Sequence, residues 1–280
     1  MKKYVNLFVF VFMVGACFSQ GKAQTKSAVS YKNPVVDIAM PDPTVIKAAD
    51  GYFYMYATES TRNVPIMKSK DLVQWTYCNT AFTNKTRPRF EPKAGIWAPD
   101  INYINNKYVL YYAMSVWGGE QTCGIGVATA DSPQGPFTDH GKMFRSNEIG
   151  VQNSIDPSFL QYEGRNYLVW GSFRGIYVIE LTEDGLSLKP GAEKKRIAGT
   201  AFEAAYIHKH GDYYYMFASI GSCCEGIRST YKVVVGRSKK VWGPYKDKSG
   251  KPMLKNGYSL VIGANDHFVG NGHGSQIIRD

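Results

Sequence analysis

The sequence repeats one pattern four times, an acidic residue followed about ten positions later by a short run rich in aromatic residues. The four acids, which stand 47 to 58 residues apart, are Asp42, Asp100, Asp156 and Glu203. The aromatic runs occupy positions 51–57, 107–113, 165–171 and 212–218. A period near 50 residues, built from short strands and turns, is typical of a β-propeller with one blade per repeat. Because equivalent positions of the blades surround one axis, we expect the four acids to converge.

A second, independent repeat supports the same architecture. Segments 127–137 and 235–245 align without a gap, and both end in Gly-Pro followed by an aromatic residue. A fifth copy of the first pattern starts at position 270, where His273 takes the place of the acid. The sequence therefore predicts an all-β, five-bladed β-propeller over residues 35–280. The fifth blade is expected to be incomplete at the C-terminus, as in a fragment or a prematurely ended chain.

The N-terminal stretch has the composition of an export signal. Lys2 and Lys3 precede an apolar run that is too short to span a bilayer. We expect a signal peptide over residues 1–23 and a flexible leader over 24–34. Two cleavage sites are possible. Signal peptidase could cut after Ala23, or a lipoprotein signal could end before Cys17, which would give a lipid anchor at that cysteine. The protein is accordingly expected to be exported, whether periplasmic, at the cell surface or secreted.

The bulk composition excludes some classes of function. The net charge of +10 comes from lysines scattered over turns, without the basic stretches interleaved with aromatics that a nucleic-acid groove needs. A solvated basic surface explains it better, with attraction to acidic polysaccharide as a weaker alternative. Without Cys17 only four cysteines remain, too few for a disulfide scaffold. The adjacent Cys223 and Cys224 are read as small residues packed in a turn, with a vicinal disulfide as the alternative.

The neighbours of the acids suggest different roles for them. Pro43 and Pro157 follow aspartates, restrict their backbones and favour rigid carboxylates. Glu203 lies among apolar residues, which should raise its pKa towards that of a general acid, and Asp156 could add a like charge that keeps it protonated. Asp42 then remains as the base. A carboxyl pair with separate acid and base duties matches hydrolysis of a glycosidic bond, and acids on different blades favour the wider, inverting separation.

Each acid taken alone also has a plain structural reading. An isolated Asp-Pro is usually a turn device, and an isolated Glu is usually solvated. Recurrence at one repeat position shifts the balance towards catalysis for Asp42, Asp156 and Glu203. Asp100 follows a proline instead, and we expect it to bind backbone groups near the site. Trp97 could equally be a core residue or a platform for a sugar ring.

An ordered set of motifs resembles glycoside hydrolase family 43. The motifs are Pro-Asp-Pro at 41–43, Trp-Ala-Pro-Asp at 97–100, Ile-Asp-Pro at 155–157, Phe-Glu-Ala at 202–204 and Gly-His-Gly-Ser at 272–275. Within that family, the Cys-Cys stretch at 223–232 with Val-Gly-Arg-Ser at 235–238 is similar to the endo-α-1,5-L-arabinanases. The resemblance implies a five-bladed propeller, an inverting mechanism and endo-acting hydrolysis of α-1,5-linked arabinan from plant cell walls.

The resemblance also implies roles for single residues. It implies that Asp42 is the general base, Glu203 the general acid and Asp156 the group that adjusts the pKa and orientation of the acid. It further implies that His273 lies in a channel beneath the site and helps to hold an ion there, often Ca²⁺, largely through waters.

Three aromatic residues could stack against sugar rings. Trp97, Trp117 and Phe202 are the candidate sugar-stacking residues. The alternatives are an exo-acting α-L-arabinofuranosidase or β-xylosidase on the same scaffold and, from another class, a non-catalytic glycan-binding propeller at the cell surface. We expect a monomer whose partner is a polysaccharide or oligosaccharide rather than a nucleic acid.

Overall fold

A computed structural model describes residues 30–275 of the chain, and the described residues from Asn33 onward form one compact unit. The expected signal peptide at 1–23, with Cys17, and most of the leader lie outside the described residues. In the described part no helix is both long and apolar enough to cross a membrane.

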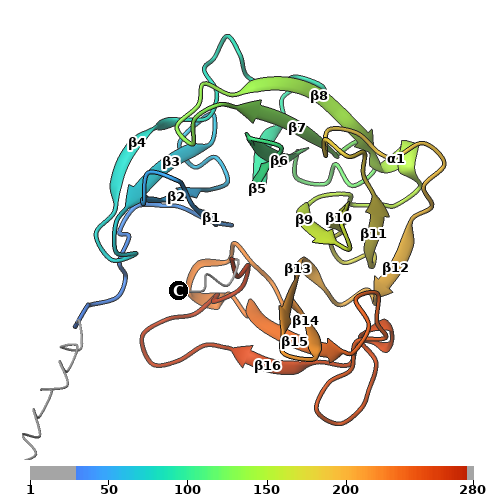
Figure 1. The fold of residues 1–280 in the computed structure, drawn as a ribbon. Coiled ribbons are helices and arrows are strands. Elements are labelled where there is room, and N and C mark those ends of the chain that lie inside the picture. Colours follow the sequence, from blue (N-terminus) through green and yellow to red (C-terminus); the bar gives the residue numbers. More distant parts are fainter. Residues whose placement is uncertain (1–29, 276–280) are drawn as a thin grey trace, which may run out of the picture. The chain divides into compact units, whose positions relative to one another are not determined.

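The compact unit contains four antiparallel sheets of four strands each, and each sheet is formed by four consecutive strands of the chain. Figure 1 shows these sheets placed around a common centre, with the first strand of each sheet innermost. The first sheet is β1 (Thr44–Lys47), β2 (Phe53–Tyr56), β3 (Pro65–Ser69) and β4 (Thr76–Thr80). The second is β5 (Gly95–Ile104), β6 (Lys107–Ser115), β7 (Gly124–Ala130) and β8 (Thr138–Arg145). The third is β9 (Ser158–Tyr162), β10 (Arg165–Trp170), β11 (Ile176–Glu180) and β12 (Lys195–Ala198). The fourth is β13 (Glu203–His210), β14 (Tyr213–Ile220), β15 (Lys232–Ser238) and β16 (Ser259–Ile262).

The fold is therefore an all-β propeller, with little helix. The short helical turns are α1 (Ser146–Ile149), η1 (Gly226–Arg228) and η2 (Met253–Lys255). The five-blade count is not confirmed, because residues 30–275 form four complete blades. The start of the fifth copy nevertheless lies against blade four: Asn271 forms a parallel bridge with Lys232, and the His273 backbone N–H donates to Ser219 Oγ at 2.7 Å.

Turn chemistry explains why the strands pair as hairpins. Asn105 and Asn106, between β5 and β6, have φ values of 48° and 63°. Two positive φ values in a two-residue loop match the twist of antiparallel strands, and asparagine tolerates that conformation well. Gly135 and Gly243, in the two aligned Gly-Pro-aromatic endings, share a φ of 78°, and the aromatics that follow are fully buried. The second repeat seen in the sequence is thus a structural repeat.

The hydrophobic core is divided among the junctions between neighbouring blades. One cluster joins blades one and two, around Tyr56, Phe82 and Tyr112. A second joins blades two and three around Trp170, and a third joins blades three and four around Met216. Strands such as β6 are buried on both faces because a sheet packs on each side of them. Complete burial of a side chain such as that of Phe82 contributes about 1.5–3 kcal/mol.

Candidate active site

Five turns, one from each sequence repeat, meet at the centre of the fold, and each has one residue in the left-handed region. These residues are Asp42, Ala98, Asp156, Ala204 and His273, with φ between 41° and 57°. The four acids are therefore not at equivalent positions, contrary to the sequence prediction. Asp42 and Asp156 are equivalent to each other and to His273, whereas Glu203 stands one residue before its left-handed position and Asp100 two residues after. Register shifts in β5 and β13 accommodate these turns within the strands.

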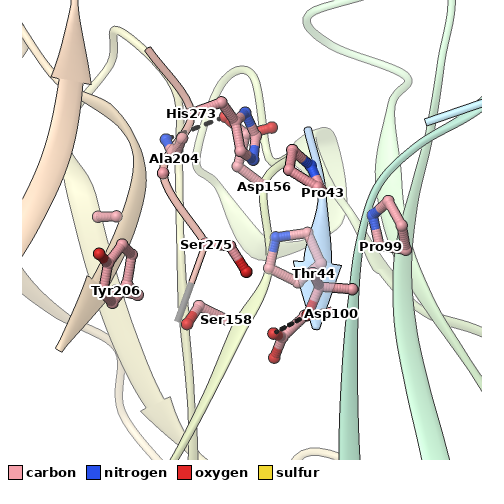
Figure 2. Close-up of a pocket in the computed structure, with 13 residues that line it drawn as sticks. Pro43, Thr44, Pro99, Asp100, Asp156, Ser158, Ala204, Tyr206, His273 and Ser275 are labelled. Atoms are coloured by element: carbon pink, nitrogen blue, oxygen red, sulfur yellow. Dashed lines mark hydrogen bonds between the residues drawn. The ribbon is translucent and has the colours of Figure 1, made fainter. Parts of the chain in front are cut away.

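Position along the turn decides which of two cavities a side chain enters. Residues one position before the left-handed residue line a cavity of about 450 Å³, and they are Pro41, Trp97, Ile155 and Glu203. Residues two positions after it line a second, narrow cavity of about 30 Å³, and they are Thr44, Asp100, Ser158, Tyr206 and Ser275. Asp156 and His273 border both cavities, and Figure 2 shows them at the narrow one. Asp42 lines the larger one, so the three predicted catalytic acids share that cavity.

Asp42 is an ionised carboxylate held by two side chains. Its Oδ2 accepts a hydrogen bond from Thr58 Oγ1 at 2.6 Å, and its Oδ1 lies 3.0 Å from His273 Nδ1. Burial tends to raise the pKa of Asp42, but the charge of His273 and the hydrogen bonds from His273 and Thr58 outweigh it and hold the pKa below its ordinary value. A carboxylate in this state can accept a proton from water.

The pKa of Glu203 is shifted in the opposite direction to that of Asp42. It is 7% exposed, and burial raises its pKa above the ordinary value against hydrogen bonds from Tyr231 and Ser172, the latter from Oγ to Oε2 at 2.7 Å. The charge of Asp42 acts in the same direction as burial, whereas that of His273 opposes it. The protonated form of Glu203 is thereby stabilised, which suits a proton donor.

Asp156 lies between these groups and supports the backbone of the acid. Its Oδ2 accepts a hydrogen bond at 3.1 Å from the backbone N–H of Ala204, the residue after Glu203. Burial raises the pKa of Asp156, and repulsion from Glu203 and Asp42 adds to that effect against the attraction of His273. Since Asp156 and Glu203 interact as like charges, they titrate as a pair.

His273 supplies the positive charge of the cluster. Burial lowers its pKa, but Asp42, Asp156 and Glu203 together raise it to about 9, so the imidazole is protonated at neutral pH. Sequence reasoning placed His273 near the site but did not foresee its ion pair with Asp42, because nothing local in the sequence links two such distant positions.

The narrow cavity lies below His273, where the family resemblance places the ion. Within residues 30–275, no group of three or more His, Cys, Asp or Glu side chains is placed to bind a metal directly. Ser275 Oγ is nevertheless buried and has no hydrogen-bond partner in that part of the chain. The cavity exceeds the roughly 10–15 Å³ that one water needs, and hydroxyls of Thr44 and Ser158 add oxygen donors. These residues fit a hydrated cation held mainly through waters, with His273 at its upper edge.

Asp100 binds backbone, as expected from the sequence. Its Oδ2 accepts hydrogen bonds from the backbone N–H of Phe159 and from Asn102 Nδ2, both at 2.7 Å. Burial raises its pKa to about 6 despite these bonds and one from Thr44. Asp100 thus joins blade two to blade three below the larger cavity.

Two of the three predicted sugar-stacking residues line the larger cavity, and the third does not. Trp97 and Trp117 line the larger cavity with ring centres 5.4 Å apart, and Trp117 is 77% exposed at its edge. Phe202 was wrongly assigned, because it is fully buried, packs in the core between blades three and four, and meets Tyr258 edge to face. Its side chain, two positions before the left-handed residue, points away from the cavity.

Several lining residues escaped sequence reasoning. They are Asn153, Ser172, Phe173, Tyr231 and the pair Cys223 and Cys224. Only the cysteine pair and Tyr231 carried a sequence signal, through the family motif at 223–232. Both cysteines are free, and their Sγ atoms lie 2.7 Å apart in the cavity wall. The others lie in connections that do not repeat from blade to blade, so the repeat could not reveal them.

The model of the family described as "Glycosyl hydrolases family 43" matches residues 31–280. An extracellular endo-α-(1→5)-L-arabinanase of Bacillus subtilis is 38% identical over 252 residues, covering 85% of this chain and 76% of that protein. An extracellular exo-α-(1→5)-L-arabinofuranosidase of Cellvibrio japonicus is 35% identical, covering 85% of this chain and 75% of that protein.

The solved structures agree with these relatives. The α-L-arabinanase of Cellvibrio cellulosa in complex with arabinohexaose superimposes with a TM-score of 0.79 at 33% identity. That comparison covers 87% of this chain and 84% of the other.

Proposed function

The chain belongs to glycosyl hydrolases family 43, and from that premise we propose that it is an endo-acting glycosidase that hydrolyses α-1,5-L-arabinofuranosidic bonds of arabinan. One observation carries the proposal: a single cavity holds a carboxyl whose pKa is lowered and another whose pKa is raised. The comparison with an arabinanase that binds arabinohexaose supports the choice of substrate.

The proposed mechanism is a single displacement with inversion. Asp42 accepts a proton from a water as the water oxygen attacks the anomeric carbon. The bond from that carbon to the leaving oxygen breaks, and Glu203 transfers its proton to this oxygen. Asp156 orients Glu203 through Ala204 N–H and, as a like charge, disfavours its ionisation. Trp97 and Trp117 offer apolar faces to the sugar rings on either side.

The first test is the product pattern from linear, debranched arabinan. We expect a ladder of oligosaccharides at early times, as random internal cleavage produces. The exo-acting relative shows why exo action is the alternative. Release of one small product from the outset would favour an exo-acting α-L-arabinofuranosidase. Release of xylose from an aryl xyloside would favour a β-xylosidase.

Replacement of the acid tests the mechanism. Glu203→Gln preserves shape but removes the transferable proton, so we expect kcat on arabinan to fall by about 10²–10⁴-fold with binding retained. The control is Glu148→Gln, on the exposed turn α1, which should leave the rate unchanged. Folded native protein that binds arabinan without any turnover would instead favour the non-catalytic glycan-binding alternative.

We also propose that a hydrated Ca²⁺ occupies the narrow cavity below His273, supported by the unpaired hydroxyl of Ser275. When bound, the ion would supply positive charge beneath the carboxyl cluster. A ligand that binds only the folded state stabilises it by about 2.7 kcal/mol at a hundred times its Kd. We therefore expect EDTA to lower the melting temperature and Ca²⁺ to restore it, while an unchanged melting temperature would contradict the proposal.

The remaining assignments follow the same premise. We propose that a fifth blade belongs to the fold, since the 270–275 segment joins the four other central turns. We propose export, because relatives are named extracellular, with a lipid anchor at Cys17 as one route and a monomeric enzyme as the product. Globomycin-sensitive processing would support the anchor, and sedimentation would test the monomer.

A further inference from the structure

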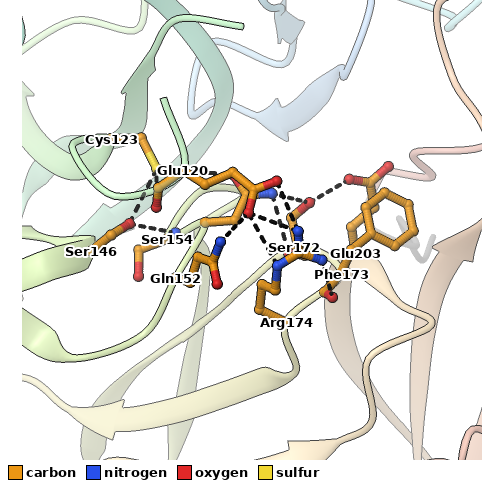
Figure 3. A network of polar contacts seen from close by, with 10 residues as sticks. Glu120, Cys123, Ser146, Gln152, Ser154, Ser172, Phe173, Arg174 and Glu203 are labelled. Atoms are coloured by element: carbon orange, nitrogen blue, oxygen red, sulfur yellow. Dashed lines mark hydrogen bonds and ion pairs between the residues drawn. The ribbon is translucent and has the colours of Figure 1, made fainter. Parts of the chain in front are cut away.

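A continuous set of hydrogen bonds leads from the chain before blade three to the acid in blade four (Figure 3). Ser172, just after β10, is 1% exposed and donates from Oγ to Glu203 Oε2 at 2.7 Å. Asn153 Nδ2 in turn donates to Ser172 Oγ at 2.9 Å and to Ser172 O at 3.2 Å. The acid is therefore connected to a fixed amide through one buried hydroxyl.

The single hydrogen of the Ser172 hydroxyl determines the direction of donation in this series of hydrogen bonds. A serine hydroxyl has one hydrogen to donate and two lone pairs to accept with. Because the Asn153 amide fills an acceptor position of Ser172, the single Ser172 hydrogen points at Glu203 Oε2. The carbonyl oxygen of a protonated carboxyl is a better acceptor than its hydroxyl oxygen, so this bond favours the acid's own proton on the other oxygen, Oε1.

We propose that Ser172 and Asn153 are positioning residues that fix Glu203 Oε2 as the accepting oxygen and so keep the transferable proton on Oε1. This inference rests on the proposed function, in which Glu203 protonates the leaving oxygen. Neither residue exchanges a proton with the substrate. They determine which oxygen of the acid presents it.

The backbone around Asn153 is built to hold the amide in place. Asn153 has a φ of 55°, a conformation that asparagine accepts more readily than most residues. Its N–H donates to Glu120 O at 2.7 Å, and its own carbonyl accepts from Ile155 N–H at 3.0 Å. The Glu120 carboxylate is itself bound by Gln152 at 2.6 Å and by Arg174 (Figure 3). The connection before β9 and the connection after β10 are thereby joined around the serine.

The hydrogen bonds from Asn153 through Ser172 to Glu203, here called the relay, shift the pKa of Glu203 in a definite direction. Donation to Glu203 favours its ionised form and so opposes burial. The titratable groups that face Glu203 are Tyr231, Asp42, Asp156, His273 and the thiol of Cys223. Removal of the Ser172 hydroxyl leaves those groups in place and should move the ionisation of Glu203 to higher pH.

The test is a ¹³C NMR titration of the Glu203 carboxyl, assigned by the signal that disappears in Glu203→Gln. In Ser172→Ala the midpoint should rise relative to the native protein. Asn153→Gly suits the positive φ and removes only the amide, so the midpoint should also rise, by less. In the double variant the Asn153 change should add nothing, because the relay is already broken. Ser238→Ala is the control, a buried serine that accepts from Lys240 N–H at the far end of β15.

Kinetics on arabinan give a second readout. We expect kcat of Ser172→Ala to fall about ten- to hundredfold with little change in KM, and the alkaline limb of the pH profile to move upward. Identical midpoints and pH profiles in folded Ser172→Ala and native protein would overturn the inference. Native protein that does not cleave arabinan would overturn the proposed function instead, and the titration would still decide whether the relay exists.

Discussion

At the scale of single residues, the site depends on backbones in the left-handed region. Asp42, Asp156 and His273 all have φ between 52° and 57°. Residues other than glycine and asparagine pay for this conformation, by about 1–3 kcal/mol where the strain is large. The conformation orients all three side chains from equivalent turns, which brings two carboxylates and an imidazolium together in a small volume. That grouping makes stability depend on pH.

The first prediction concerns this pH dependence. The pKa of His273 rises from 6.5 in the unfolded chain to about 9 in the folded protein. Its contribution is fully present below pH 6.5 and is lost as the pH rises through about 9. The raised pKa values of Asp156 and Glu203 act in the same direction. We expect the free energy of unfolding to fall between pH 6.5 and 9, by up to about 3 kcal/mol from His273 alone.

Urea denaturation at several pH values measures this fall. His273→Gln removes one titrating group, so its decline over the same range should be shallower than that of the native protein. A native free energy of unfolding that stays constant from pH 6.5 to 9 would show that His273 is not held as described.

Sequence reasoning reached some of these residues and missed others for physical reasons. Asp42 and Asp156 were found because proline marks their turns and the turns repeat. Phe202 was misplaced because a shift of one position along the turn reverses the side to which a side chain points. Ser172 and Asn153 gave no signal, because each acts through contacts between connections that differ from blade to blade.

At the scale of elements, the blades are joined by polar contacts as well as by the core. Glu59, after β2, accepts from the backbone N–H groups of Asn63 at 2.8 Å and of Ile96, in β5, at 2.9 Å. Its carboxylate pairs with Arg87, which also donates to Ala94 O at 2.8 Å. Both side chains are at most 10% exposed. The pair therefore connects blade one to the first strand of blade two.

The second prediction follows from the burial of this pair. Arg87→Met would leave the Glu59 carboxylate buried without its partner, so we expect a loss of about 3–5 kcal/mol in the free energy of unfolding. Lys107→Met breaks a pair with Asp131 that is 53% and 85% exposed, and should cost less than about 1 kcal/mol. Guanidinium denaturation of both variants gives the comparison, and equal losses would refute the bracing role of Arg87.

At the scale of the whole molecule, the 270–275 segment contributes to the site although it is distant from the other central turns in the sequence. Gly272 packs against the ring of Tyr231, and an added Cβ would lie 2.1 Å from Tyr231 Cδ1. Tyr231 in turn donates to Glu203. The contact at Gly272 therefore reaches the acid through one side chain.

The third prediction uses two glycines of this segment. Gly272→Ala must displace Tyr231, so we expect a loss of about 1–3 kcal/mol in stability and a lower kcat on arabinan. Gly274→Ala is the matched control, since its Cβ would meet Val233 and Tyr206 at the ordinary distances of 3.5 and 3.7 Å. Indistinguishable melting temperatures and rates for the two variants would contradict the packing described at Gly272.

The central turns also define how the site could be redesigned. The residue before the left-handed position faces the larger cavity in four of the turns, whereas the residue two positions after it faces the narrow cavity in all five. Apart from Asp156 and His273, which border both cavities, the two linings can therefore be varied as separate sets of positions. Ile155, equivalent to Trp97 in the next blade, is the natural first position at which to add an aromatic platform without touching the carboxyl cluster.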